Sequence, residues 1–426
     1  MASSDGGPAM RPEFQRQIPN AAGVLLILFF ALFPLVYTGG NYDYVMHVLI
    51  TAFFYAILSA SWSMLAGYAG QFSFGHMAFM AIGAYTAALF GHYFWITGEA
   101  TGLCREIPFF GNWLVVVNPI GVTSTTLDQD CLRQAMTAWD GSVSVTRMPI
   151  WLGIVLGTLM GGLAGFLVGI LVLRLRAAYL ALFTLGFSEI VKAVISAEID
   201  ITRGQAGMEL PPLFPDGVTL FGQAFGPTDK IPPYYAMFGL LLLCLAILTW
   251  LARSRFGLFV RALREDQDAA AALGVNTTRY KVVVFTITCA MAATAGAVQA
   301  HYVQIVTPNM LFLLQMSLVV AMAVIGGIEN FVAAALGAIF LQIMLEVLRT
   351  SFTIGGVEVD MTTWRLVFFG LLLMVTLRFF RNGLIAPLID RFRRAGVAAE
   401  TVEKRTATLT GPGGGPHRAD AAEVPE

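Results

Sequence analysis

Long apolar runs recur along the whole chain, and they constrain its fold more than any other feature. A helix needs roughly 20 apolar residues to cross the hydrocarbon layer of a bilayer. The chain supplies such runs repeatedly, separated by short polar breaks. Hydrophobic residues make up 57% of the sequence and charged residues only 12%, whereas soluble domains carry about 25% charged residues. We therefore predict an all-α, polytopic membrane protein.

The apolar windows predict a helical bundle of about ten transmembrane helices. A leader (1–18) carries Arg11 and Arg16, and the run behind it is long for a signal-peptide core, so we interpret that run as a retained first span. The transmembrane domain is expected over 19–394, and a polar, Gly- and Pro-rich tail (395–426) is expected to be disordered. The windows lie near residues 19–38, 45–65, 72–95, 150–173, 178–197, 234–252, 282–302, 311–327, 332–350 and 362–380.

The positive charges predict the orientation of the chain. If the N-terminus is cytoplasmic, the short loops on that side receive most of the arginines, and the C-terminus is cytoplasmic as well. The other side receives few basic residues over two longer loops, 96–149 and 198–233. Cys104 and Cys131 both fall in the first of these loops, where an oxidising compartment would permit a disulfide; two unrelated thiols are the alternative.

A polar segment on the cytoplasmic side, 253–281, predicts a short helix. Acidic Glu265, Asp266 and Asp268 suit the positive end of a helix dipole, a run of alanines favours helix, and Gly274 fits a left-handed stop. Such a helix could dock into a groove on a partner. A solvated connector is the simpler interpretation.

A second segment, Gly67 to Tyr85, contains glycines that would weaken a continuous helix and therefore predicts an interrupted one. Interrupted helices are tolerated at membrane depth where the freed backbone lines a cavity. Gln71, Ser73 and His76 could then contact a solute. The same small residues would also allow close helix packing, which is the structural alternative.

A third segment places Glu189 and Lys192 three residues apart on one face of a predicted helix. An isolated charge at mid-bilayer costs about 2.5–3.5 kcal/mol on insertion scales, so we expect the two to be paired and to face the bundle interior. They either join helices or line the path of a solute.

Together these segments resemble the LivM-type permeases of branched-chain amino acid ABC importers, over roughly Tyr44 to Leu384. The resemblance rests on four motifs in order: Gly67-Tyr-Ala-Gly-Gln-Phe-Ser-Phe-Gly-His76, Tyr179-Leu-Ala-Leu-Phe-Thr-Leu-Gly-Phe-Ser-Glu-Ile190, Arg264-Glu-Asp266 and Val324-Ile-Gly-Gly-Ile-Glu-Asn330. It implies location in the bacterial inner membrane. It also implies a LivH-like second permease, two cytoplasmic ATPase subunits and a periplasmic solute-binding protein.

The resemblance implies that 253–281 is the loop gripped by the ATPase. The coupling residues are then Arg264, Glu265, Asp266, Asp268, Ala270, Ala271, Leu273 and Gly274. We also expect an internal inverted repeat. Departures from the family at Lys192, at Ile201 to Met208 and in the long insert leave the solute open: branched-chain amino acids are the default, and urea, short amides or aromatic carboxylates are alternatives.

The chain contains no phosphate-binding loop, since no lysine follows a glycine. We therefore expect no cofactor and no enzymatic activity in this chain, with ATP bound by separate subunits. An intramembrane protease built on Ser73 and His76 is a weak alternative, because Ser-x-x-His alone carries little information. An ion-coupled secondary transporter using Glu189 is more plausible. The histidines show no metal-ligand spacing, and no basic stripe suggests nucleic acid.

Overall fold

A computed structural model gives the fold of most of the chain. It describes residues 21–37, 39–92, 94–97, 105–109, 113–117, 144–146, 149–172, 177–220, 222–349, 352–354, 357–359, 361–380 and 383–387. These residues divide between two units. One contains α1 (Ala21–Val36), and the other is Gly39–Pro387.

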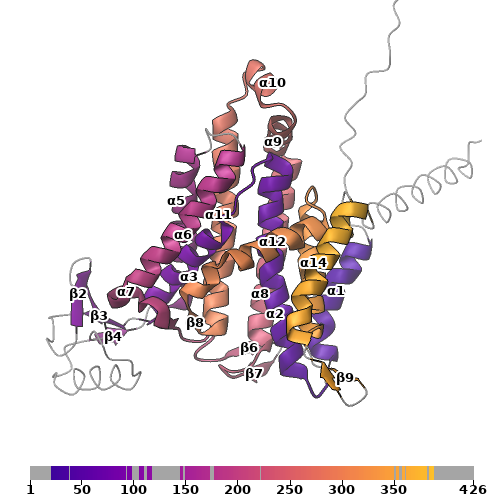
Figure 1. Cartoon of the computed structure of the whole chain (residues 1–426). Coiled ribbons are helices and arrows are strands. Elements are labelled where there is room, and N and C mark those ends of the chain that lie inside the picture. The colour runs from indigo at the N-terminus through magenta and orange to yellow at the C-terminus, as the bar shows by residue number, and fades with distance from the viewer. Residues whose placement is uncertain are drawn as a thin grey trace, which may run out of the picture. The chain divides into compact units, whose positions relative to one another are not determined.

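Gly39–Pro387 is a bundle of long helices. Those longer than twelve residues are α2 (Tyr42–Ser63), α3 (His76–His92), α5 (Ile150–Val172), α6 (Ala177–Ala197), α8 (Ile231–Arg253), α11 (Thr277–Val303), α12 (Leu313–Gly326), α13 (Phe331–Val347) and α14 (Met361–Phe379). The shorter helices are α7 (Ile199–Thr202), α9 (Arg255–Glu265) and α10 (Gln267–Ala272). In Figure 1, α10 lies at one end of this bundle, and β6, β7 and β8 lie at the other.

Each predicted window therefore contains a helix, counting α1. By length and composition five of the described helices could cross a membrane, or six if α12 and α13 form one span bent by 117°. The five are Tyr42–Tyr68, Ile150–Val172, Tyr179–Ala197, Ile231–Arg253 and Thr277–Val303. Large apolar side chains of α5, α8 and α14 are exposed, as expected for faces that meet lipid or another subunit.

Short antiparallel strands lie in the polar segments between helices. The loop predicted over 96–149 contributes strands to an antiparallel sheet of order β2-β3-β1-β4. Two of the other strand pairs involve the loop predicted over 198–233. The strands are β1 (Phe94–Thr97), β2 (Arg105–Phe109), β3 (Trp113–Val117), β4 (Ser144–Thr146), β5 (Met208–Glu209), β6 (Val218–Leu220), β7 (Gln223–Phe225), β8 (Ile305–Val306), β9 (Phe352–Ile354) and β10 (Val357–Val359). β5 pairs with β8, β6 with β7, and β9 with β10.

Small residues let α3, α5 and α11 approach closely. A Cβ added to Gly83 would lie 2.2 Å from the Ala293 carbonyl oxygen, and one added to Gly296 would lie 2.2 Å from that of Met80. On α5, a Cβ on Gly161 would lie 2.2 Å from the Ala293 Cβ. Close packing of this kind drives helix association in membranes. Lipid tails are as apolar as leucine side chains, so the hydrophobic effect gives no driving force between the helices there.

Helix α2 forms the other half of the core, where it packs against α13 and α8. From Val48 to Ser63 its residues are buried except for Thr51 and Tyr55, which are half-buried. On the α8 side, the Phe53 ring lies 5.3 Å from the Tyr234 ring and 5.3 Å from the Phe238 ring, centroid to centroid. This central position of α2 matters because its end leads into the Gly-rich segment.

Candidate functional site

The Gly-rich segment interrupts the helix as predicted. α2 ends in a π-helical turn, Met64–Tyr68, and α3 begins only at His76. Gly70 in the break has φ +64°, a conformation that suits glycine. The break closes on itself through the N–H of Gln71, which donates to the Leu65 carbonyl at 3.1 Å.

Ser73 holds this break in shape. Its carbonyl accepts a hydrogen bond from the Trp62 indole N–H at 2.8 Å, and its hydroxyl accepts one from the Gly75 N–H at 3.2 Å. The next residue, Phe74, donates its N–H to the Thr184 hydroxyl of α6 at 3.0 Å. Ser73 is fully buried, and its contacts give it a structural role in this chain.

Gln71 and His76 differ from Ser73, because their side chains find no hydrogen-bond partner among the described residues. Both are buried, and the two amide atoms of Gln71 and both ring nitrogens of His76 are shielded and unpaired. An unsatisfied buried polar group is costly, so native proteins seldom keep one without a water, an ion, a ligand or a partner. Of the residues predicted to contact a solute, Gln71 and His76 are the two whose buried polar side-chain atoms have no partner among the described residues.

Glu189 and Lys192 form the predicted ion pair on α6, with 3.5 Å between Lys192 Nζ and a Glu189 oxygen. The Lys192 Nζ also lies 4.3 Å from the centroid of the Phe312 ring. The pair is not in the interior of this chain, since the Glu189 side chain is 49% exposed. The reason is that α6 has few neighbours in the described part of the chain, so this face is left uncovered.

The segment 253–281 contains two helices rather than one. α9 ends at Glu265, and Asp266 caps α10 by accepting from the N–H groups of Asp268 at 2.9 Å and Ala269 at 3.0 Å. The expectation that Glu265 lies at the start of the alanine helix is therefore wrong. Glu265 closes α9, an amphipathic helix whose buried positions Gly257, Val260 and Leu263 recur every three residues, so the sequence carried a signal for this helix that the prediction missed.

The C-terminal end of α10 is as predicted. Gly274 has φ +83° and donates its N–H to Ala271 O at 2.9 Å, while Val275 donates to Ala270 O at 3.1 Å. This is the paired bonding of a Schellman motif. Of the residues in α10 only Ala270 is buried, and the Leu273 side chain after it is 86% exposed.

Arg264 points toward the helix breaks rather than outward with α10. Its guanidinium donates to the Gly67 carbonyl and to the Glu329 carboxylate. Glu329 belongs to a second break, between α12 and α13, where the Asn330 side chain caps α13 by accepting from Val332 N–H at 3.0 Å. Local sequence gave no signal for this contact, because Arg264 and Glu329 lie in separate motifs.

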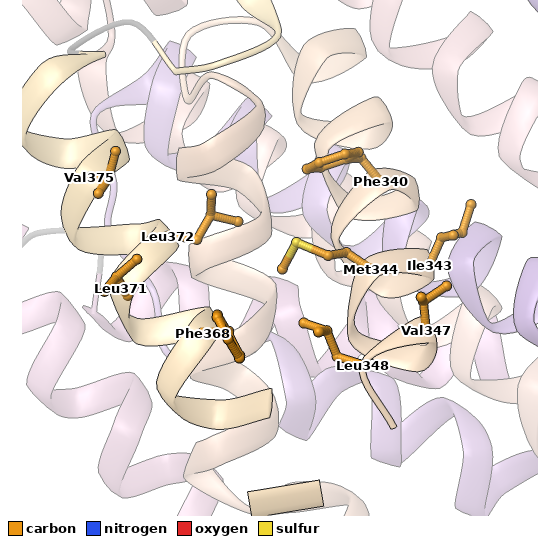
Figure 2. A pocket seen from close by; sticks show the side chains of 9 residues that line it. All are labelled: Phe340, Ile343, Met344, Val347, Leu348, Phe368, Leu371, Leu372 and Val375. Carbon is orange, nitrogen blue, oxygen red and sulfur yellow. The ribbon is translucent and has the colours of Figure 1, made fainter. Parts of the chain in front are cut away.

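Two hollows differ in chemistry. A groove of about 620 Å³ between α13 and α14 is lined only by apolar side chains, shown in Figure 2. A smaller hollow of about 250 Å³ lies next to β7 and β8 and includes His47, Asp229, Lys230 and Tyr302. There His47 Nδ1 and the Tyr302 hydroxyl share a hydrogen bond of 2.8 Å. Only the second hollow offers polar groups to a polar solute.

Cys104 and Cys131 lie outside the described residues, so their pairing stays a prediction. Cys244 and Cys289 are buried free thiols in α8 and α11. Within the described part of the chain, no three His, Cys, Asp or Glu side chains are grouped so that they could hold a metal ion.

Comparison with known proteins identifies the family. Residues 44–377 match the family described as branched-chain amino acid transport system, permease component. The high-affinity branched-chain amino acid transport system permease protein LivM of Escherichia coli K12 is 29% identical over 84% of this chain and 80% of its own. LivH of the same organism is 31% identical over 42% of this chain and 57% of its own.

A relative with another printed solute is the fructose import permease protein FrcC of Rhizobium meliloti, 28% identical over 36% of this chain and 42% of its own. No solved structure matches. The family match covers most of the chain and includes both helix breaks and the α9–α10 segment. The chain therefore belongs to the family of branched-chain amino acid transport permease components.

Proposed function

We propose that this chain forms half of the translocation pathway of an ATP-driven importer for branched-chain amino acids or a related small polar solute. As a member of its family it is a multi-pass membrane protein and a permease subunit of an ABC importer. The observation that carries the proposal is α10: a short helix, capped at both ends and almost fully exposed, at one end of the bundle. A helix with a single buried residue, Ala270, suits a docking element for a motor subunit.

The partners follow from this assignment. Relatives named LivM and LivH are permeases of one transport system, so this chain acts in a permease pair. We infer that two ATPase subunits bind at α10 and hydrolyse the ATP, since the chain contains no phosphate-binding loop. A solute-binding protein would deliver the solute at the opposite end, where the polar hollow with Lys230 and His47 lies.

The orientation proposed is that of the positive-inside rule, in a bacterial inner membrane with both termini cytoplasmic. The segment 253–281 is then cytoplasmic, and 96–149 and 198–233 are periplasmic. We further propose ten spans and an inverted repeat, supported by the fact that α3 and α13 both follow a Gly-containing break after an apolar helix. The two breaks would be the equivalent points of the repeats.

The solute path is proposed to pass the α2–α3 break. Gln71 and His76 supply unpaired polar atoms there, and Ser73 shapes the backbone around them. Glu189 and Lys192 would face the second permease, because their face of α6 is open in this chain. Both assignments need the pair of permeases to complete the path.

The test is reconstitution of this chain in liposomes with a LivH-like permease, the ATPases and the binding protein from the same organism. ATP-dependent uptake of labelled leucine, isoleucine or valine is the expected result. Uptake of urea, amides, aromatic carboxylates or fructose instead would keep the permease assignment and change the solute. Uptake driven by a proton gradient without ATP would contradict the proposal and favour a secondary transporter.

A further inference from the structure

Two arginines of α9 contact the helix breaks: Arg264 reaches both the α2–α3 and the α12–α13 break, and Arg261 reaches the first. We propose that Arg264, assisted by Arg261, transmits the movement of α9–α10 to the α2–α3 and α12–α13 breaks. The proposal rests on the proposed function, because it needs an ATPase that moves α10. It assigns Arg264 an inward, positioning role instead of a contact with the ATPase.

The guanidinium of Arg264 bridges two separate elements. One Nη donates to the Gly67 carbonyl in the π-helical turn that ends α2, and the other donates to the Glu329 carboxylate in the α12–α13 break. A guanidinium is a planar fork, so it holds its two acceptors at a fixed separation and angle. A lysine ammonium is a point charge on a flexible stem and would not fix that geometry.

Arg261 repeats the connection one turn earlier on the same face of α9. Its Nη2 donates to the Tyr68 hydroxyl at 2.8 Å, and its guanidinium carbon lies 4.5 Å from the centroid of the Tyr68 ring. That ring in turn lies 5.7 Å from the ring of Phe331, the first residue of α13. Both arginines therefore join α9 to α2 directly and to the α12–α13 region.

The two breaks are packed so closely that one cannot shift alone. A Cβ on Gly67 would lie 1.8 Å from the Ile328 carbonyl oxygen, and the Ser63 hydroxyl donates to that same oxygen at 2.8 Å. A Cβ on Gly70 would lie 3.3 Å from the Arg264 Cγ. Gln71, whose side-chain amide has no partner among the described residues, directly follows Gly70 in the chain. The contact from α9 therefore reaches the proposed solute path.

Stability does not explain this arrangement. The Arg264 side chain is 32% exposed and that of Glu329 is 67% exposed, and ion pairs this open contribute little to folding. Their position is more informative. Arg264 precedes the cap of α10, Asp266, by only two residues, so any tilt of α10 acts directly on the Arg264 backbone.

The experiment measures uptake and ATP hydrolysis together in liposomes holding the complete complex. R264K and E329Q should each lower uptake per ATP hydrolysed by about tenfold, a typical size for coupling between sites. The double variant R264K/E329Q should have an uptake per ATP no lower than that of either single variant, because both substitutions disrupt the same Arg264–Glu329 contact. R255K is the matched control, since Arg255 is an exposed arginine at the other end of α9, and it should leave the ratio unchanged.

Charge exchange adds a rescue. R264E alone should uncouple the complex, and R264E/E329R should recover part of the lost uptake per ATP. If R264K proves poorly inserted, Y68F removes the hydroxyl that Arg261 binds while keeping the ring, and it should lower the ratio by a smaller factor.

Two results would overturn the proposal. The first is normal uptake per ATP in R264K or, where R264K inserts poorly, in Y68F. The second is loss of the ATPases from the complex in R264K but not in E329Q, because Arg264 would then contact the ATPase directly. Failure of the proposed function gives a different result, because then the wild-type complex itself shows no ATP-dependent uptake.

Discussion

The left-handed turn after α10 tests whether this short helix carries the contact with an ATPase. Gly274 has φ +83°, and a Cβ added there would meet no atom within 4 Å. Replacement therefore introduces backbone strain without a steric clash. The hydrogen bond from Val275 N–H to Ala270 O requires the left-handed conformation at residue 274, and the bond from Gly274 N–H to Ala271 O accompanies it in the same motif.

The magnitude follows from the strain and from the small size of the helix. A residue with a side chain in this conformation costs about 1–2 kcal/mol, and Asn tolerates it better than Ala. Burial cannot offset that cost, because only Ala270 of α10 is buried, and isolated helices under about 12 residues are marginal in water. The folded-to-unfolded ratio of α10 should therefore fall by roughly five- to thirtyfold.

Hydrogen exchange of the α10 amides, measured by mass spectrometry in nanodiscs, reports this ratio. G274A should speed exchange by the factor above, and G274N should speed it less. Affinity for the ATPase subunits should fall in the same order, because only the folded fraction of α10 is competent to bind. The control is G222A. Gly222 has φ +79° with no atom within 4 Å of an added Cβ, and it lies in the turn between β6 and β7, at the opposite end.

Two outcomes would refute this reasoning. If G274A exchanges like the wild type, the turn does not hold α10 in shape. If G222A weakens ATPase binding as much as G274A does, the loss reflects general damage and α10 is not the docking element.

Three further predictions follow from the geometry. G83A should lower the melting temperature in detergent, because its Cβ would lie 2.2 Å from Ala293 O and overpacking costs about 1–3 kcal/mol; G239A, with no atom within 4 Å in α8, should not. Gln71→Leu and His76→Phe should reduce uptake without reducing stability, because they remove unpaired polar atoms. Ser73→Ala should instead reduce stability. If Gln71→Leu and His76→Phe lower the melting temperature but leave uptake normal, Gln71 and His76 are packing residues. A cysteine at Leu273, 86% exposed, should react with impermeant reagents only from the cytoplasm, and labelling from the periplasm would reverse the topology.

The features that the sequence predicted best depend on near neighbours in the chain. The interruption of the helix within Gly67 to Tyr85 and the left-handed stop at Gly274 were identified from residue type and spacing, and the acidic residues indicated the start of α10 without singling out Asp266 as its cap. Caps and left-handed turns are decided by the conformation of a few consecutive residues, so a short window contains the information. Apolar windows located helices for the same reason.

The features that it missed depend on residues far apart. Nothing local links Arg264 to Glu329 or Arg261 to Tyr68. The exposure of Glu189 was also missed, because the inside of a bundle cannot be told from a subunit interface by charge alone. The long-range contacts and the exposure of Glu189 are both set by how the helices pack against one another. A single sequence does not reveal that arrangement.

The distribution of close contacts indicates where the bundle can move. Between α3, α5 and α11 the backbones touch, with Gly83 and Gly296 leaving no room for a methyl group, and such packed interfaces transmit displacement rather than absorb it. At the α2–α3 and α12–α13 breaks the two backbones also touch each other, at Gly67 and Ile328, but the chain is held there by polar contacts from Ser73, Arg264 and Asn330 as well, which can be broken and remade. A push on α9 would therefore leave the three-helix block intact and act on the breaks. Since Gln71 and His76 lie at one of these breaks, two of the buried polar side chains that have no partner among the described residues stand where the chain can move.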